Sequence, residues 1–155
     1  MPAKNNQTRI MVFGTFDGVH PGHLNLFKQA KNLAPKSFLI VSVARDKNVL
    51  KIKGHLPEKD ERERIKIVGK CRAVDKVVLS GLHDHLPHII KERPDIIALG
   101  YDQKYYVKNL KKDLKNSGLK VEIARLNPFK EKIYKNRLLK KLNIARTDSS
   151  GNVNS

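Results

Sequence analysis

The sequence is poor in three features that often define a class of protein: cysteine, long apolar runs and acidic residues. Its only cysteine is Cys71, which excludes an intrachain disulfide and a zinc site built from four cysteines. No apolar run approaches the ~18 residues that a membrane-spanning helix needs. The first ten residues, MPAKNNQTRI, also lack the apolar stretch of a signal peptide. We therefore expect a cytoplasmic protein without a membrane segment.

The shortage of acidic residues leaves a large positive charge. Lysine and arginine number 32, and aspartate and glutamate 15, among 155 residues, so the formal net charge is +17. The excess is largest in the stretch 104–141, where 13 residues are basic and 3 are acidic. Such a charge suggests polyanionic partners: nucleic acid, an anionic membrane or phosphorylated small molecules. The alternative is that most of these lysines only solvate exposed helix faces.

Hydrophobic periodicity along the chain alternates between that of strands and that of helices. We predict strands at 9–14, 37–44, 76–79, 95–100 and 120–124, helices at 21–33, 59–70, 85–93, 105–117 and 133–142, and a long loop at 45–58. This alternation is typical of an α/β fold: a Rossmann-like, doubly wound parallel five-stranded sheet with helices on both faces. Residues 1–145 would form a single domain and residues 146–155 a flexible polar tail. In such folds, ligands bind beyond the carboxyl ends of the strands, where the strand order reverses.

The most informative segment is GTFDGVHPGH at 14–23, which joins the first predicted strand to the first predicted helix. Free backbone N–H groups at the helix start, together with the positive end of the helix dipole, make an anion-binding site. The glycines allow the backbone to approach a ligand closely. His20 and His23 lie three residues apart, so both imidazoles can face one pocket. Neither the dinucleotide pattern GxGxxG nor the phosphate loop GxxxxGKS/T occurs, so the turn predicts an anion site of another kind.

This segment resembles the GTFDxxHxGH signature of the cytidylyltransferase-like nucleotidylyltransferases, with the HxGH element intact at 20–23. The resemblance continues through 43–47, 63–68, 74–77 and 95–103, and covers roughly residues 9–126. The segment GYDQ at 100–103 is more similar to the archaeal-type FAD synthases than to the glycerol-3-phosphate cytidylyltransferases. Members of this superfamily transfer a nucleoside monophosphate from ATP or CTP to an acceptor and release pyrophosphate.

The resemblance implies a role for each residue of the site. His20 and His23 would be catalytic, donating hydrogen bonds to the triphosphate where charge builds on the bridging oxygen. The nucleotide would be bound by Thr15, Phe16, His20, Pro21, Gly22, His23 and Asp102. Further contacts to substrate or phosphate would come from Asp17, Lys53, Arg64 and Arg137. A divalent cation, most simply Mg²⁺, would accompany ATP without a dedicated protein site.

Several of these residues also have ordinary structural explanations. Asp102 could be a helix N-cap, and Asp17 could orient the turn or a histidine, or serve as an Asx-turn residue. Lys53, like the other lysines of the predicted 45–58 loop, could be a solvated charge. Asn136 and Arg137 stand where many relatives carry hydroxyl residues, so Arg137 could replace hydroxyl contacts by charge. The histidines of HDHLPH at 83–88 lack a fourth ligand, which favours a surface loop over a zinc site.

The leading hypothesis is an FMN adenylyltransferase, which converts ATP and FMN to FAD and pyrophosphate. An alternative within the same class is a cytidylyltransferase that uses CTP and glycerol 3-phosphate or a sugar phosphate. A second alternative is a basic nucleic-acid-binding protein with Tyr105 and Tyr106 as stacking groups, although such a protein does not need the 14–23 turn. We expect small-molecule substrates rather than nucleic acid. A homodimer is compatible with the resemblance, but no apolar interface stands out in the sequence.

Overall fold

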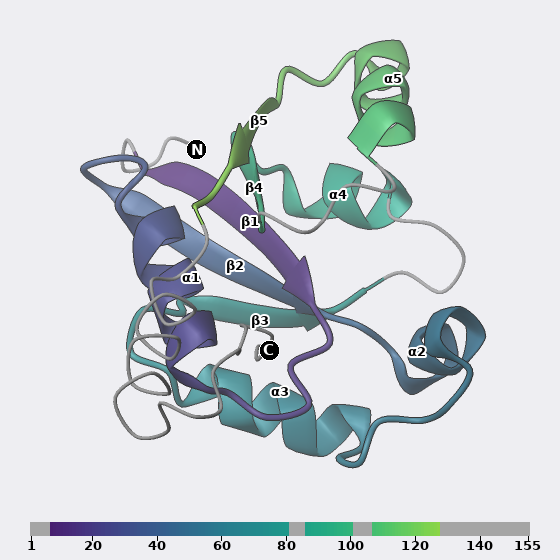
Figure 1. Cartoon of the computed structure of the whole chain (residues 1–155). Helices are drawn as coiled ribbons and strands as arrows, with labels where there is room; N and C mark the ends of the chain where they lie inside the picture. Colours follow the sequence, from purple (N-terminus) through teal and green to yellow (C-terminus); the bar gives the residue numbers. More distant parts are fainter. Residues whose placement is uncertain (1–6, 81–85, 101–106, 128–155) are drawn as a thin grey trace, which may run out of the picture.

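The computed structural model describes residues 7–80, 86–100 and 107–127, and it places a parallel sheet between layers of helices (Figure 1). The strands are β1 (Thr8–Gly14), β2 (Ser37–Val43), β3 (Lys76–Leu79), β4 (Ile96–Leu99) and β5 (Glu122–Arg125). The helices are α1 (Pro21–Lys31), α2 (Asp46–Lys53), α3 (Glu61–Gly69), α4 (Leu86–Glu92) and α5 (Val107–Ser117). Each strand pairing is parallel and the strand order is β3-β2-β1-β4-β5. The predicted fold class is confirmed.

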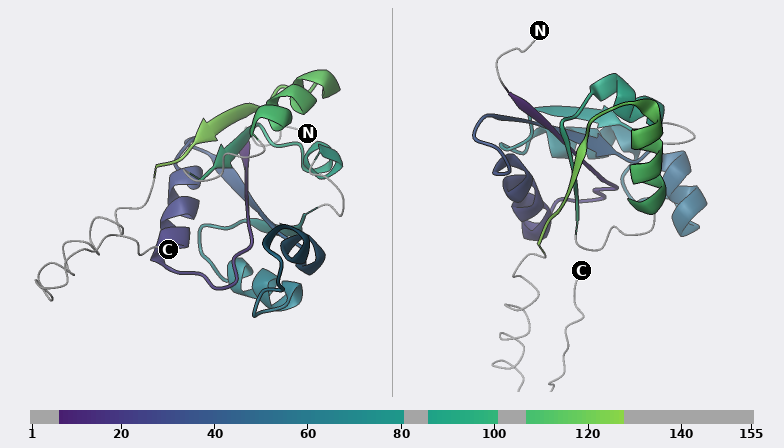
Figure 2. Two further views of the ribbon diagram at one scale, coloured as in Figure 1. Left: turned by 45° about the vertical axis from the view of Figure 1, so that its right-hand side comes forward. Right: turned by 90° about the horizontal axis from the view of Figure 1, so that it is seen from above.

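β1 occupies the centre of the sheet because both of its faces are apolar. Successive side chains of a strand point to opposite faces, so Ile10 and Val12 join the core beneath α1 and α3. Met11 and Phe13 join the core beneath α4 and α5. Figure 2 shows these two pairs of helices on opposite faces of the sheet. Complete burial of such a side chain contributes about 1.5–3 kcal/mol, which makes β1 a rigid base for the turn that follows it.

The loop predicted at 45–58 is wrong, because the structure places the helix α2 within it. α2 begins at Asp46, whose charge suits the positive end of a helix. It ends at Gly54, which has a φ of 83°, a left-handed conformation that glycine adopts readily. Val49 is the sole buried residue of this helix. The sequence of α2 therefore shows little apolar periodicity, and the residues at its two ends are what indicate a helix.

The other elements differ from the prediction mainly at their boundaries. The helix predicted at 59–70 is Glu61–Gly69, because the carboxylate of Asp60 caps it by accepting a 2.9 Å hydrogen bond from the N–H of Glu63. The helix predicted at 133–142 and the tail at 146–155 lie outside the described residues.

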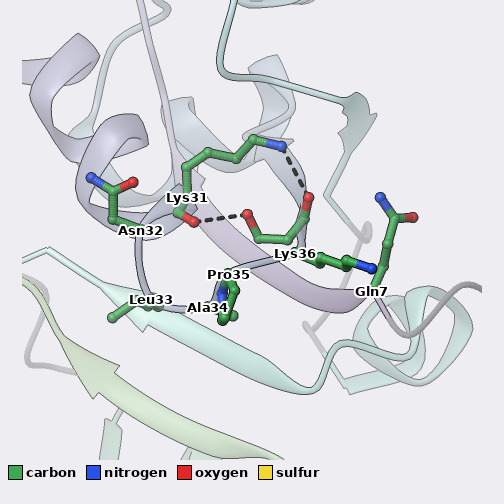
Figure 3. Close-up of a pocket in the computed structure, with 8 residues that line it drawn as sticks. Gln7, Lys31, Asn32, Leu33, Ala34, Pro35 and Lys36 are labelled. Carbon is green, nitrogen blue, oxygen red and sulfur yellow. Dashed lines mark hydrogen bonds between the residues drawn. The ribbon is translucent and has the colours of Figure 1, made fainter.

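The order of the strands identifies the edge of the sheet at which a ligand is expected. The direction of strand addition reverses between β1 and β4, so the carboxyl ends of these two strands flank the switch point. A hollow lies at the opposite, amino-terminal edge, lined by Gln7 and residues 31–37 (Figure 3). There Lys31 Nζ donates to the carbonyl oxygen of Ser37 at 3.0 Å, and Ser37 Oγ donates to that of Lys31 at 2.7 Å. That hollow belongs to the α1–β2 connection and is separate from the predicted site.

Candidate active site

The turn between β1 and α1 has a compact and strained backbone. Phe16 adopts a φ of 53°, which is left-handed, and the residue is 4% exposed. The ring lies directly over Gly14, where a Cβ atom would come within 2.6 Å of Phe16 Cζ. Left-handed backbone at a non-glycine residue costs about 1–3 kcal/mol and persists only where the surroundings enforce it. Gly14 is therefore required by the packing of Phe16.

His20 and His23 close the start of α1 by capping each other. His20 is the N-cap residue, and its Nδ1 accepts a hydrogen bond from the N–H of Gly22 at 3.0 Å. His23 Nδ1 accepts in return from the N–H of His20 at 3.2 Å, which completes a capping box made of two imidazoles. Pro21 occupies the first helical position, where its missing N–H costs nothing. The two rings stack with centroids 3.9 Å apart and planes at 27°.

In this capping arrangement, the backbone N–H groups at the start of α1 donate hydrogen bonds to partners within the protein. Those of His23 and Leu24 donate to the carbonyl oxygen of His20 at 2.9 and 3.1 Å, and those of His20 and Gly22 donate to imidazole nitrogens. The backbone N–H groups at the start of α1 are therefore not free, contrary to the expectation for this helix end. The imidazoles of His20 and His23 are the side-chain donors at the same place.

The caps also determine which nitrogen of each ring carries the proton. A neutral imidazole has one acceptor nitrogen and one N–H. Since Nδ1 of both His20 and His23 accepts a hydrogen bond, the proton of each neutral ring lies on Nε2. Two imidazoles in this tautomer thus lie beside the positive end of the α1 dipole, and both Nε2–H groups and helix N-termini are suited to a phosphate.

Phe16 links the turn to the second histidine. Its ring meets the ring of His23 edge-on, at a centroid distance of 5.1 Å and an angle of 70°. On its other side it packs against Phe27, which is fully buried in α1, at 5.4 Å. Edge-on aromatic contacts contribute about 0.5–1.5 kcal/mol beyond the buried area. The orientation of His23 therefore depends on the conformation of Phe16.

Asp17 binds the connection between α2 and α3, a partner that the sequence did not indicate. Its Oδ2 accepts from the N–H of Glu58 and its Oδ1 from the N–H of Lys59, both at 2.8 Å. Partial burial raises the pKa of Asp17, but these two N–H groups and the nearby charges of Lys59 and Arg64 outweigh that effect and lower it below 3.8. The carboxylate is therefore ionised at neutral pH and acts as a double acceptor.

Arg64 is fully buried, and its guanidinium forms hydrogen bonds and an ion pair with other groups of the protein. Nη1 donates to the carbonyl oxygens of Thr15 and Ala44 at 2.8 and 2.7 Å, and Nε donates to that of Lys59 at 3.0 Å. Nη2 forms an ion pair with Asp46 at 2.6 Å. The structure thus corrects the expected substrate contact of Arg64, because burial commits this side chain to holding the turn, the end of β2 and α2 together.

α2 is anchored at its first turn by the start of α3. The N–H of Asp46 donates to Glu61 Oε1 at 2.8 Å, and the N–H of Glu61 donates to Asp46 Oδ2 at 3.3 Å. Arg45, just before α2, donates from Nε to the carbonyl oxygen of Ser80 at 2.7 Å. Lys53 lies at the other end of α2 and is exposed to solvent. Lys47 and Lys51 on the same helix are exposed as well.

The structure gathers most of the predicted site residues in one place. The turn and the first turn of α1 contain Thr15, Phe16, Asp17, His20, Pro21, Gly22 and His23. Asp102 and Arg137 lie outside the described residues. Sequence reasoning missed the connection at 58–59 and the N-terminus of α2. The acidic residue Asp46, three residues after the end of the buried strand β2, was the available signal for the latter.

The histidine-rich segment at 83–88 is described only from residue 86 onward. His88 Nε2 lies 2.8 Å from Ser42 Oγ, on the face of the sheet that α4 covers. His83 and His85 lie outside the described residues. Among the residues that the structure describes, no three His, Cys, Asp or Glu side chains gather where they could hold a metal ion. In the same part of the chain, no helix has the length and apolar character needed to cross a membrane.

Comparison with known proteins defines the class to which this fold and site belong. Residues 11–147 match the family described as cytidylyltransferase-like. The chain belongs to that family, and it is a nucleotidyltransferase.

Individual relatives are similar over most of their lengths. The FAD synthase of Korarchaeum cryptofilum is 47% identical over 122 residues, which are 78% of this chain and 82% of the relative. The FAD synthase of Archaeoglobus profundus is 41% identical over 127 residues, 81% of this chain and 79% of the relative. A crystal structure described as the lipopolysaccharide core biosynthesis protein from Thermoplasma volcanium is 34% identical, with a TM-score of 0.72, and the match covers 79% of this chain and 98% of that one.

Proposed function

We propose that the chain is an FMN adenylyltransferase, which transfers AMP from ATP to FMN and releases pyrophosphate. The observation that carries this proposal is the stacked pair of imidazoles at the start of α1, whose Nδ1 atoms cap the helix and hold both rings in place. The similarity to FAD synthases over about four fifths of the chain supports FMN as the acceptor.

In the proposed reaction, an oxygen of the FMN phosphate attacks the α-phosphorus of ATP in line. The bond from that phosphorus to the oxygen bridging it to the β-phosphorus breaks, and pyrophosphate leaves with the electron pair. Charge therefore builds on the bridging oxygen and on the β-phosphoryl group. His20 and His23 donate from Nε2 to these oxygens, and because their rings are already fixed by the caps, they need little reorganisation as the charge develops.

The remaining residues of the site position the nucleotide. We assign Thr15 and Phe16 to contacts with the nucleotide through the turn, and Pro21 and Gly22 to its close approach to the start of α1. Asp102 would contact the ribose, while Lys53, and Arg137 farther along the chain, would balance phosphate charge. Mg²⁺ would arrive bound to the triphosphate and neutralise part of its charge, since such ions are held largely by substrate phosphates.

Acceptor choice is tested by supplying purified full-length protein with Mg²⁺, either ATP or CTP, and a panel of FMN, glycerol 3-phosphate and sugar phosphates. Pyrophosphate release and chromatography of the product measure transfer directly. We expect turnover with ATP and FMN, and FAD as the product. Turnover only with a phosphorylated polyol or sugar would reject FMN as the acceptor.

A second acceptor class is favoured by one observation. The structural neighbour from Thermoplasma volcanium is described as a lipopolysaccharide core biosynthesis protein, and it matches over almost its full length. A carbohydrate phosphate is therefore the alternative acceptor, and the same panel separates it from FMN. Tight binding of oligonucleotides without binding of ATP would instead support the nucleic-acid hypothesis, with a steep dependence on salt.

A further inference from the structure

Asp17 and Arg64 converge on a single residue of the α2–α3 connection. Asp17 Oδ1 accepts from the N–H of Lys59 at 2.8 Å, and Arg64 Nε donates to the carbonyl oxygen of Lys59 at 3.0 Å. Both backbone groups of Lys59 are therefore held, one from the β1–α1 turn and the other from α3. Asp17 Oδ2 extends the contact to the N–H of Glu58. The connection cannot move relative to the turn without breaking these hydrogen bonds.

Arg64 also reaches the turn directly. One nitrogen, Nη1, donates to the carbonyl oxygens of Thr15 and Ala44, which follow the adjacent strands β1 and β2. A planar guanidinium that serves two carbonyl groups from a buried position fixes their separation and orientation. The peptide that it holds leads into Phe16, whose left-handed backbone and buried ring were described above. The ring of Phe16 in turn contacts His23.

These contacts form a continuous path from the α2–α3 connection to a catalytic histidine. It runs from Lys59 through Arg64 to the carbonyl group of Thr15, then through Phe16 to the ring of His23. Each step is a hydrogen bond, the peptide bond between Thr15 and Phe16, or a ring contact, and the residues along it are buried or partly buried. A shift at one end therefore changes the placement of His23 at the other.

We propose that Asp17 and Arg64 are positioning residues that clamp the α2–α3 connection onto the β1–α1 turn and thereby align His23. The proposal rests on the proposed nucleotidyl transfer at the same site and goes beyond it, because neither residue touches the substrate. A misaligned hydrogen-bond donor destabilises the transition state more than the ground state, because ATP in the ground state is also bound through other contacts. Loss of the clamp therefore lowers kcat, while the KM for ATP changes little.

The kinetic test uses Arg64→Lys and Asp17→Asn, singly and together. Lysine keeps the charge of Arg64, but its single nitrogen cannot reach all four partners that the three guanidinium nitrogens serve. Asparagine keeps one of the two carboxylate acceptors of Asp17. We expect Arg64→Lys to lower kcat about 10- to 100-fold and Asp17→Asn about 5- to 10-fold, with KM for ATP within about threefold of wild type. Because both act on Lys59, the double variant should lose less than the product of the two single losses.

Matched controls come from exposed residues of the same types. Arg62→Lys lies on α3, as Arg64 does, and Asp113→Asn lies on α5. Both controls should retain wild-type kcat. A rise in KM for ATP with unchanged kcat in Arg64→Lys would overturn the proposal, since it would show direct binding of the nucleotide by Arg64. Fully multiplicative losses in the double variant would overturn it as well.

Backbone hydrogen exchange of the free protein tests the clamp without any assumption about the acceptor. In Asp17→Asn the amides of Glu58 and Lys59 should exchange faster than in wild type, while both controls leave them unchanged. Exchange at the wild-type rate would overturn the clamp. If the clamp variants show faster exchange but wild-type protein does not turn over FMN, the clamp stands and the proposed acceptor fails. Should Arg64→Lys not fold, Asp17→Asn and Asp46→Asn carry the same tests, because neither side chain is fully buried.

Discussion

The two edges of the sheet differ in what their charged residues hold in place. At the amino-terminal edge, charges pair with one another: buried Glu92 contacts Lys76 at 2.9 Å and Arg9 at 3.6 Å, and Lys31 contacts Asp75 at 2.6 Å. At the carboxyl edge, Asp17 and Arg64 contact mainly the backbone, and they surround a strained turn. The first edge holds strands together, whereas the second holds one turn in one conformation.

Both edges contain a left-handed residue and a buried charged side chain, and the edges differ in what these groups hold. The ion pairs of the amino-terminal edge join α4 to β1 and β3, and α1 to the segment before β3. Arg93, beside Glu92, has a left-handed φ of 51° at the end of α4. At the carboxyl edge, left-handed Phe16 and fully buried Arg64 are both unfavourable when taken alone. Strain and buried charge of this kind are typical of functional sites. The following predictions test that division, from the largest expected effect to the smallest.

The largest effect should come from separating the two roles of His23. In His23→Asn, the amide oxygen takes the place of Nδ1 and can still accept from the N–H of His20, but the Nε2 donor is lost. We expect kcat to fall about 10²- to 10³-fold, as for the removal of an oxyanion donor, with little change in Tm. Pyrophosphate release and thermal unfolding measure the two quantities.

The control for that variant is His55→Asn, since His55 is exposed and outside the turn. It should leave kcat unchanged. The truncation His23→Ala, which removes both nitrogens, should lower kcat similarly and also destabilise the start of α1, because the cap contact is lost. Unchanged kcat in either His23 variant would contradict the proposed role of the imidazole.

A second prediction concerns the strained turn itself. Gly14→Ala would place a Cβ atom within 2.6 Å of the Phe16 ring, which must then shift. We expect a loss of about 1–3 kcal/mol in the free energy of unfolding, measured with urea, as for overpacked cores, and a drop in kcat because His23 rests on that ring. Gly18→Ala is the matched control, since a Cβ atom at Gly18 meets nothing within 4 Å; its stability should equal that of wild type.

A third prediction separates stability from activity at the opposite edge. Glu92→Gln removes the charge that Lys76 and Arg9 share. Because both cationic side chains are partly exposed, we expect a loss of about 1 kcal/mol, with kcat unchanged at temperatures below the unfolding transition. Glu122→Gln, an exposed position on β5, should change neither quantity. A fall in kcat in Glu92→Gln would contradict the division between the two edges.

The smallest effect is a dependence on acid pH. Folding lowers the pKa of Asp17 below its ordinary 3.8, so its contribution to stability is complete above the unfolded-state value. That contribution is lost as the pH falls through the lower, folded-state value. The difference in stability between wild type and Asp17→Asn should therefore be constant near neutral pH and disappear in acid. Urea titrations from pH 7 down to about pH 3 measure it, and a difference that grows in acid would contradict the assigned sign.

The sequence predicted the parts of the molecule that depend on local pattern. The apolar runs of β1 and β2 and the HxGH spacing reveal the strands and the turn because side-chain periodicity and residue type are visible without three-dimensional contacts. α2 lacked such a pattern, with Val49 alone buried. The partners of Asp17 and Arg64 lie 42 and 49 residues away along the chain, and contacts of that range leave no local signal. The same separation explains why Arg64 was expected at the substrate rather than beneath the turn.

α2 joins the rest of the protein mainly through its first turn, where Asp46 meets Glu61 and Arg64. Beyond that turn, Leu50 and Ile52 are 47% and 65% exposed, and Gly54 ends the helix in open space. The outer half of this helix therefore contributes little to the packing of the sheet or of the histidine pair. Polar substitutions at Leu50 and Ile52 should accordingly change the surface of the protein while leaving its unfolding temperature close to that of wild type.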